Sequence, residues 1–212
     1  MKIKAIICDV GGVFVRSGDT SRRQIWEKRF GLAPGELSEI VYRIEPADRA
    51  TVGIVNSEKI WKDIGEKFLL SAEEIKLLNE DFFAGDVPNE NFYVFIKKLR
   101  LKYKTAILSN AWENARIIYS HKYKLDALFD VMVISAEVGM QKPDKRIFRY
   151  TLELLGVHPQ EAIFIDDIPE NCRAAGKVGI NAIIFTDTET VVQEMKKMLI
   201  NNSYQEGFLA LT

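Results

Sequence analysis

The segment Ile6-Ile7-Cys8-Asp9-Val10-Gly11-Gly12-Val13 decides the fold of this chain. It begins as an apolar run typical of a buried strand and breaks at a carboxylate, Asp9, which two glycines follow closely. Glycine allows a backbone to turn sharply or to approach a ligand closely. In open α/β sheets, ligands bind beyond the carboxyl ends of the strands. Asp9 is therefore either an ordinary turn residue or a catalytic carboxylate, and later segments favour the second role.

Strand and helix patterns alternate over the C-terminal part of the chain, which predicts a parallel sheet with right-handed crossovers. The strands expected after the first one cover residues 105–108, 129–134, 162–165 and 181–185. Before them, the pattern is helical from about 21 to 83. This stretch predicts four short helices, with Pro46 ending one helix and Ser57 capping another, and a linker at 84–88.

The fold class that we expect is α/β: a doubly wound parallel sheet with an inserted small α-helical domain. Residues 1–15 and 89–212 would form the α/β core domain, and 16–88 the helical domain. Because the insertion follows the first strand, we expect the helical domain to lie over the strand ends. The tail at 201–212 carries no interpretable pattern.

Composition excludes several classes of protein. The 212 residues are 47% hydrophobic and 28% charged, with a net charge of -1, so a generally basic nucleic-acid-binding surface is not indicated. No apolar run approaches the ~20 residues of a membrane span, and the N-terminus lacks the apolar core of a signal peptide. Cys8 and Cys172 have neither metal-site nor disulfide spacing. We therefore expect a cytoplasmic protein with no membrane or nucleic-acid partner.

Polar side chains follow four of the expected strands, and in a parallel sheet these ends lie at one edge. They are Asp9, Ser109-Asn110, Lys142 in the loop after the third strand, and Asp166-Asp167. Crowded carboxylates repel one another unless a cation resolves the conflict, and Mg²⁺ prefers such oxygen ligands together with a substrate phosphate. Lys142 would balance Asp9 and hold a phosphate, and Ser109 would donate to phosphate oxygens. Asp9 is then the natural nucleophile for an aspartyl-phosphate.

With these residues in place, the sequence resembles the haloacid dehalogenase superfamily, in its subgroup with a helical cap between the first and second motifs. Four segments match the family's motifs in order: Asp9, Ser109, Gln141-Lys142-Pro143-Asp144, and Asp166-Asp167 with Asn171. The resemblance implies that Asp167 ligates the metal directly and that Gly11 offers it a backbone carbonyl. Asp166 would orient Lys142 or ligate the metal through water.

Three neighbouring positions have less specific roles. Asn110 and Gly12 are candidates for substrate contact or for shaping the turn at the site. Asn171 either belongs to the fourth motif or caps a helix.

The sequence departs from the resemblance at Gly11. Phosphatases of this superfamily typically carry a second Asp there, which serves as general acid and base, and such help is typically worth ~10²–10⁴ in rate. We therefore expect a Mg²⁺-dependent phosphatase of a small phosphorylated metabolite that is slow or restricted to good leaving groups. Two alternatives stay open: a 2-haloacid dehalogenase, and a non-catalytic module that binds a phosphate ligand or a partner protein.

The helical domain should select the substrate. Five of its arginines are either contacts for a second anionic group or solvated surface charges: Arg16, Arg22, Arg23, Arg43 and Arg49. Asp19, just beyond the first strand, is a candidate substitute for the missing acid.

Overall fold

A computed structural model of the chain describes residues 2–203, with side chains up to residue 199. Its centre is a five-stranded sheet in the order β5-β4-β1-β6-β7, in which all pairs are parallel. The strands are β1 (Ala5–Cys8), β4 (Lys104–Ser109), β5 (Val131–Ile134), β6 (Ala162–Asp166) and β7 (Asn181–Ile184). In register, Cys8 lies opposite Ile107 and Ile165, so the carboxyl ends of the three central strands meet at one edge. The expected α/β fold with a parallel sheet is confirmed.

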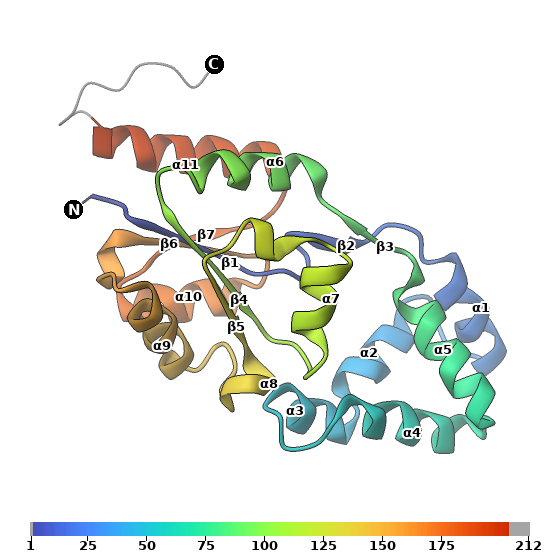
Figure 1. Ribbon diagram of the computed structural model, residues 1–212. Helices are drawn as coiled ribbons and strands as arrows, with labels where there is room; N and C mark the ends of the chain where they lie inside the picture. The colour runs from blue at the N-terminus through green and yellow to red at the C-terminus, as the bar shows by residue number, and fades with distance from the viewer. Residues whose placement is uncertain (1, 204–212) are drawn as a thin grey trace.

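Helices cover both faces of the sheet (Figure 1). One face carries α6 (Glu90–Leu99) and α11 (Thr188–Ser203), and the other carries α9 (Lys145–Leu155) and α10 (Pro169–Val178). Side chains alternate between the faces of a strand, so that within β1 Ile6 and Cys8 join one apolar cluster and Ala5 and Ile7 the other. Burial on both faces explains the continuous apolar runs of these strands.

Five helices between residues 21 and 84 form a separate unit, which we call the insert. They are α1 (Ser21–Phe30), α2 (Glu36–Arg43), α3 (Glu45–Thr51), α4 (Ser57–Phe68) and α5 (Ala72–Ala84). The insert packs around its own apolar cluster, which includes Trp26, Ile60 and Phe82. The prediction of four helices was wrong, because Pro46 does not end a helix. It stands in the first turn of α3, where the missing N–H of proline costs nothing.

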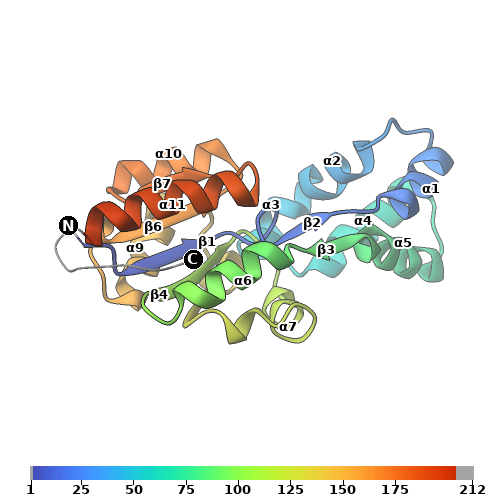
Figure 2. The same ribbon diagram turned by 90° about the horizontal axis from the view of Figure 1, so that it is seen from above.

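A two-stranded antiparallel ribbon joins the insert to the sheet domain (Figure 2). It pairs β2 (Val15–Ser17) with β3 (Asp86–Pro88), where a linker was expected at 84–88. Asn89 fixes the base of this ribbon, since its backbone N–H donates to the Phe14 carbonyl (2.8 Å) and its side chain donates to the Val13 carbonyl (3.1 Å). The division of the chain at 15/16 and 88/89 stays a prediction.

The insert also contacts the sheet domain beyond the ribbon. Ser57 does not cap α4 with its own side chain as predicted. Its hydroxyl and backbone N–H donate to the Glu113 carboxylate, at 2.7 Å and 3.0 Å from Oε1. A Cβ built on Gly53 would lie 2.1 Å from the Ala136 carbonyl oxygen, so the two backbones touch there. These contacts hold the insert over the edge of the sheet where the strands end.

The remaining elements are short. They are α7 (Ala115–His121), α8 (Ser135–Val138) and the 3₁₀ turns η1 (Leu125–Ala127) and η2 (Pro159–Glu161). The third sheet strand begins at Val131, later than the predicted residue 129. Within residues 2–203, the structure contains no helix with the length and apolar character needed to cross a membrane. Most of the tail at 201–212 lies outside the described residues.

Candidate active site

Lys142 connects two strand ends. Its ammonium nitrogen lies 2.9 Å from Asp9 Oδ1 and 2.6 Å from Asp166 Oδ2. All three residues are buried, and Lys142 is 2% exposed. Asp9 directly follows β1, Asp166 ends β6, and Lys142 comes from the loop between α8 and α9. Parallel pairing of the strands thus brings together residues that are far apart in the sequence.

Asp166 fixes the position of Lys142. Its Oδ1 accepts from the Ile168 N–H (2.8 Å) and from Asn171 Nδ2 (3.1 Å). Its Oδ2 accepts from Lys142 Nζ (2.6 Å) and from the same Asn171 nitrogen (3.1 Å). A carboxylate has about four acceptor sites, and these contacts occupy them. Asn171 therefore acts on Asp166 and does not cap α10, whose N-cap residue is Ile168.

Asp9 keeps one oxygen available. Its Oδ1 accepts from the Val10 N–H at 2.7 Å and contacts Lys142, whereas no described residue donates a hydrogen bond to Oδ2. Burial raises the pKa of Asp9 to about 6, while the Lys142 charge lowers it and the Asp166 charge raises it. Burial also raises the pKa of the neighbouring Cys8 thiol well above its usual value, so that Cys8 is no rival nucleophile.

The residues fit a hard divalent cation. One carboxylate oxygen each of Asp9, Asp166 and Asp167 lie within 4.8 Å of one another. Burial, followed by the Asp166 charge, raises the pKa of Asp167, and a cation would relieve both effects. Since the oxygens of Asp166 are already engaged, Asp9 and Asp167 have the more accessible donors. Carboxylate oxygens with no nitrogen or sulfur ligand among them suit Mg²⁺.

The two glycines after Asp9 occupy different environments. Gly12 has a φ of +72°, and a Cβ there would lie 2.1 Å from Asp167 Oδ2, so only glycine lets Asp167 approach this loop. A Cβ on Gly11 would meet no atom within 4 Å. The position of the absent acid is therefore sterically open.

Ser109 and Asn110 have different partners. The Ser109 hydroxyl, 2% exposed as a residue, lies 3.0 Å from the hydroxyl of Tyr119 in α7. The Asn110 amide makes two 2.8 Å hydrogen bonds to the backbone of Lys142, donating to its carbonyl and accepting from its N–H. The geometry gives Asn110 a role in holding the Lys142 loop, and its contact with substrate stays a prediction.

Sequence reasoning missed three residues near this edge: Tyr119, Trp112 and Glu113. Burial, opposed by the hydrogen bond to Ser109 and reinforced by the Asp9 charge, raises the pKa of Tyr119, so its hydroxyl stays protonated. Trp112 packs against the apolar cluster of the insert, although it belongs to the sheet domain. The sequence offers one signal for these three residues, which is that they lie within ten positions of Ser109.

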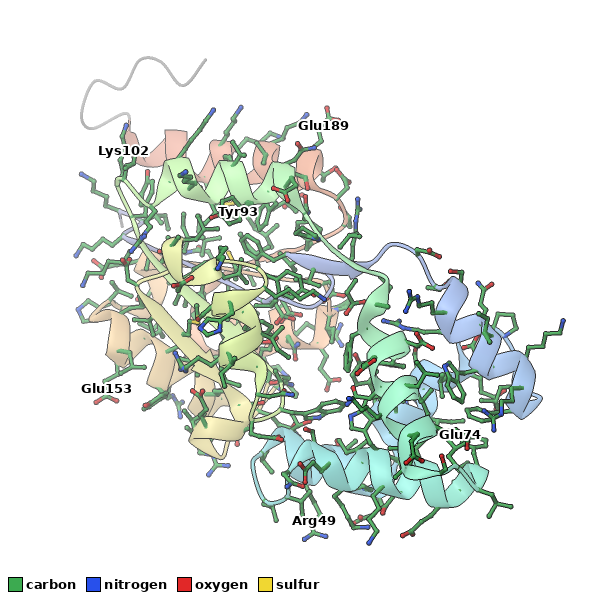
Figure 3. All side chains as sticks on the ribbon, turned by 45° about the vertical axis from the view of Figure 1, so that its right-hand side comes forward. Arg49, Glu74, Tyr93, Lys102, Glu153 and Glu189 are labelled. Carbon is green, nitrogen blue, oxygen red and sulfur yellow. The ribbon has the colours of Figure 1, made fainter. Side chains whose placement is uncertain are left out.

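Most arginines named as substrate contacts are paired with acids. Arg22 binds Asp81 (2.9 Å), Arg23 binds Asp86 (2.9 Å), and two exposed helical pairs complete the set: Arg43 with Glu39 and Arg49 with Glu45. Figure 3 shows Arg49 at the rim of the insert, pointing out of the molecule. Arg16 is exposed.

Asp19 lies at the start of α1, where its carboxylate accepts from the Ser21 N–H at 2.9 Å. That backbone hydrogen bond lowers the pKa of Asp19. The shift keeps the carboxyl ionised, which disfavours it as a substitute proton donor.

Comparison with known proteins gives a consistent family assignment. The family model described as haloacid dehalogenase-like hydrolase matches residues 26–185. The chain is 35% identical over 201 residues to the sesquiterpene phosphatase astK of Aspergillus oryzae, covering 92% of this chain and 96% of that protein. It is 30% identical over 207 residues to mouse acyl-CoA dehydrogenase family member 10, but spans only 19% of that protein's length.

A solved structure shares the fold. The HAD family enzyme from Bacteroides thetaiotaomicron, in complex with magnesium and inorganic phosphate, superposes with a TM-score of 0.72 at 24% identity, over 87% of this chain and 94% of that one. The match to the family model covers most of the chain, and the fungal relative is similar along nearly its whole length. The chain therefore belongs to the haloacid dehalogenase-like hydrolase family.

Proposed function

We propose that this hydrolase is a Mg²⁺-dependent phosphatase that acts on a small phosphorylated molecule through an aspartyl-phosphate on Asp9. The carrying observation is the buried Asp9–Lys142–Asp166 contact beside the Asp167 carboxylate. The name of the fungal phosphatase and the magnesium and phosphate bound to the Bacteroides enzyme support the same proposal.

Five residues of the site have defined tasks in this proposed reaction. The Asp9 Oδ2 oxygen attacks phosphorus, and the bond to the leaving oxygen breaks with its electron pair on that oxygen. Lys142, held by Asp166, and the Ser109 hydroxyl would bind the phosphoryl oxygens. Mg²⁺, bound by Asp9 and Asp167, would supply positive charge to the phosphoryl group. Water then attacks phosphorus, releasing inorganic phosphate and regenerating the Asp9 carboxylate.

The leaving group must do without help from residue 11. Glycine has no proton to give, so the leaving oxygen departs as an anion or takes its proton from water. Aryl and acyl phosphates release stable anions and should therefore react, whereas alkyl phosphates should react slowly.

A phosphate-release assay with Mg²⁺ tests the proposal over aryl, acyl and alkyl phosphates. We expect turnover of the first two classes that is lost in Asp9→Asn. Equal turnover by Asp9→Asn, or none over the whole panel, contradicts the proposal. Metal-independent chloride release from a 2-haloacid would identify a dehalogenase instead, and phosphate-ligand binding without turnover would identify a non-catalytic module.

A further inference from the structure

Aromatic side chains from both parts of the molecule meet beside the strand ends. Trp112, three residues after Ser109, comes from the sheet domain. Its ring centroid lies 6.0 Å from that of Tyr42 in α2, 6.4 Å from that of Trp61 in α4 and 6.4 Å from that of Phe83 in α5. We call these four residues the aromatic cluster. It places flat apolar surface next to the segment that carries Ser109.

Tyr42 has an unusual combination of exposure and environment. The residue is 54% exposed. Its ring nevertheless packs against two aromatic neighbours, with centroid distances of 5.7 Å to Phe82 and 6.0 Å to Trp112. Within the described part of the chain, no residue hydrogen-bonds to the Tyr42 hydroxyl. Tyr42 therefore offers an accessible aromatic surface that its neighbours hold in place.

Ser109 and Trp112 relate the cluster to the strand ends. Trp112, which belongs to the cluster, follows Ser109 by three residues, and the Ser109 hydroxyl lies 3.0 Å from that of Tyr119. The ring of Tyr42 reaches across from the insert to within 6.0 Å of the Trp112 ring, centroid to centroid. The aromatic cluster therefore lies beside the end of the strand that carries Ser109.

Two charged residues near the cluster, Arg23 and Glu113, already have hydrogen-bond partners. Arg23 stacks over the Phe82 ring at 4.3 Å, and its guanidinium binds Asp86 (2.9 Å) and the Ser17 hydroxyl (2.8 Å). The Glu113 carboxylate is engaged by Ser57. A second anionic group on the substrate would therefore find no uncompensated cation among these residues.

We propose that the group esterified to the phosphate is uncharged and apolar and lies against Tyr42 and Trp112. This inference rests on the proposed phosphatase function and names its substrate class. Sites for such groups are lined by aromatic side chains with a few polar groups that fix orientation. Binding energy from this remote group would assist the reaction at phosphorus.

Three aryl phosphates with similar leaving oxygens test the proposal: phenyl phosphate, 4-phenylphenyl phosphate and 3-carboxyphenyl phosphate. We expect kcat/KM with Mg²⁺ to be at least tenfold higher for 4-phenylphenyl than for phenyl phosphate, and lowest for the carboxylated ester. Tyr42→Ala should reduce the preference for the second ring at least threefold. Tyr150→Ala, which removes a 36% exposed tyrosine from α9, should leave it unchanged.

Equal kcat/KM for the first two esters, preference for the carboxylated one, or a ratio unaffected by Tyr42→Ala overturns the proposal. Calorimetric binding of phenylphosphonate and 4-phenylphenylphosphonate separates it from the proposed function. A Tyr42-dependent preference without any turnover would support the apolar site and reject the phosphatase. Turnover without such a preference would support the phosphatase and reject the apolar site.

Discussion

Placing a carboxyl group at residue 11 should widen the range of esters that the proposed phosphatase hydrolyses. In Gly11→Asp, the new Cβ meets no atom within 4 Å, and the backbone does not require the left-handed conformation there. Asp9, Asp166 and Asp167 are close by, and like charges favour the protonated form of a carboxyl group. The new side chain should therefore be able to give a proton to the leaving oxygen.

The expected gain follows from the usual value of general acid catalysis, ~10²–10⁴ in rate. At about 1.36 kcal/mol per tenfold, the barrier would fall by about 3–5 kcal/mol. We expect most of this gain in kcat for ethyl phosphate, whose alkoxide is a poor leaving group. For 4-nitrophenyl phosphate, which needs no protonation, the change should stay below about threefold, because the missing acid is not limiting.

Gly11→Asn is the matched control, because it has the same size and no transferable proton. Phosphate release from both esters, measured with Mg²⁺ for wild type and the two variants, gives the comparison. An equal gain in the Asn variant, or an equal gain on both esters in the Asp variant, would refute the reasoning. So would loss of folding in Gly11→Asp by circular dichroism, since the structure leaves that position open.

Three further predictions concern Asp9 and its surroundings. Tyr119→Phe removes one hydrogen bond to Ser109, worth about 0.5–1.5 kcal/mol. This loss should raise KM about threefold to tenfold, while kcat changes less. An unchanged KM would show that Tyr119 does not position Ser109. Glu113→Gln weakens the charged hydrogen bonds to Ser57, which help to hold the insert over the sheet. Limited proteolysis of the ribbon should therefore become faster, and KM should rise. Identical cleavage rates in wild type and variant would argue against this role of the contact. Burial holds the pKa of Asp9 at about 6, above its value in the unfolded chain. Without metal, the unfolded chain therefore loses this proton at lower pH than the folded one, and the free energy of unfolding falls as pH rises from about 4 to 7. Denaturant titrations should show this slope in wild type, a smaller slope in Asp9→Asn, and partial reversal of the slope by Mg²⁺.

The sheet and its strand ends could be predicted because burial leaves a clear mark on the sequence. Runs such as Ala162–Asp166 are apolar on both faces and then break at a carboxylate. The parallel topology brings such breaks to one edge, which is why Asp9 and Lys142 could be expected together. Local chemistry is similarly readable at Ser71, which forms a capping box with Glu74 three residues later in the chain.

Contacts over long sequence separations could not be predicted in this way. The strands β2 and β3 have three residues each, too few to show alternation, and they pair Ser17 with Asp86. Ser57 has the composition of a helix cap, but its partner Glu113 is 56 residues away. Pro46 is compatible with the end of one helix and the start of the next, and only packing decides.

The ribbon at the base of the insert has a consequence for how this hydrolase can be rebuilt. The chain enters and leaves the insert through neighbouring positions, with Val15 opposite Pro88 and Ser17 opposite Asp86. Asn89, directly after β3, donates to the Phe14 and Val13 carbonyls in the loop that follows Asp9, and Arg23 of α1 ties both strands to the insert through Ser17 and Asp86. A foreign helical unit grafted between residues 17 and 86 would keep the Asn89 contacts at this junction, but it would have to replace the contacts that Arg23 makes with the ribbon and that Ser57 makes with Glu113.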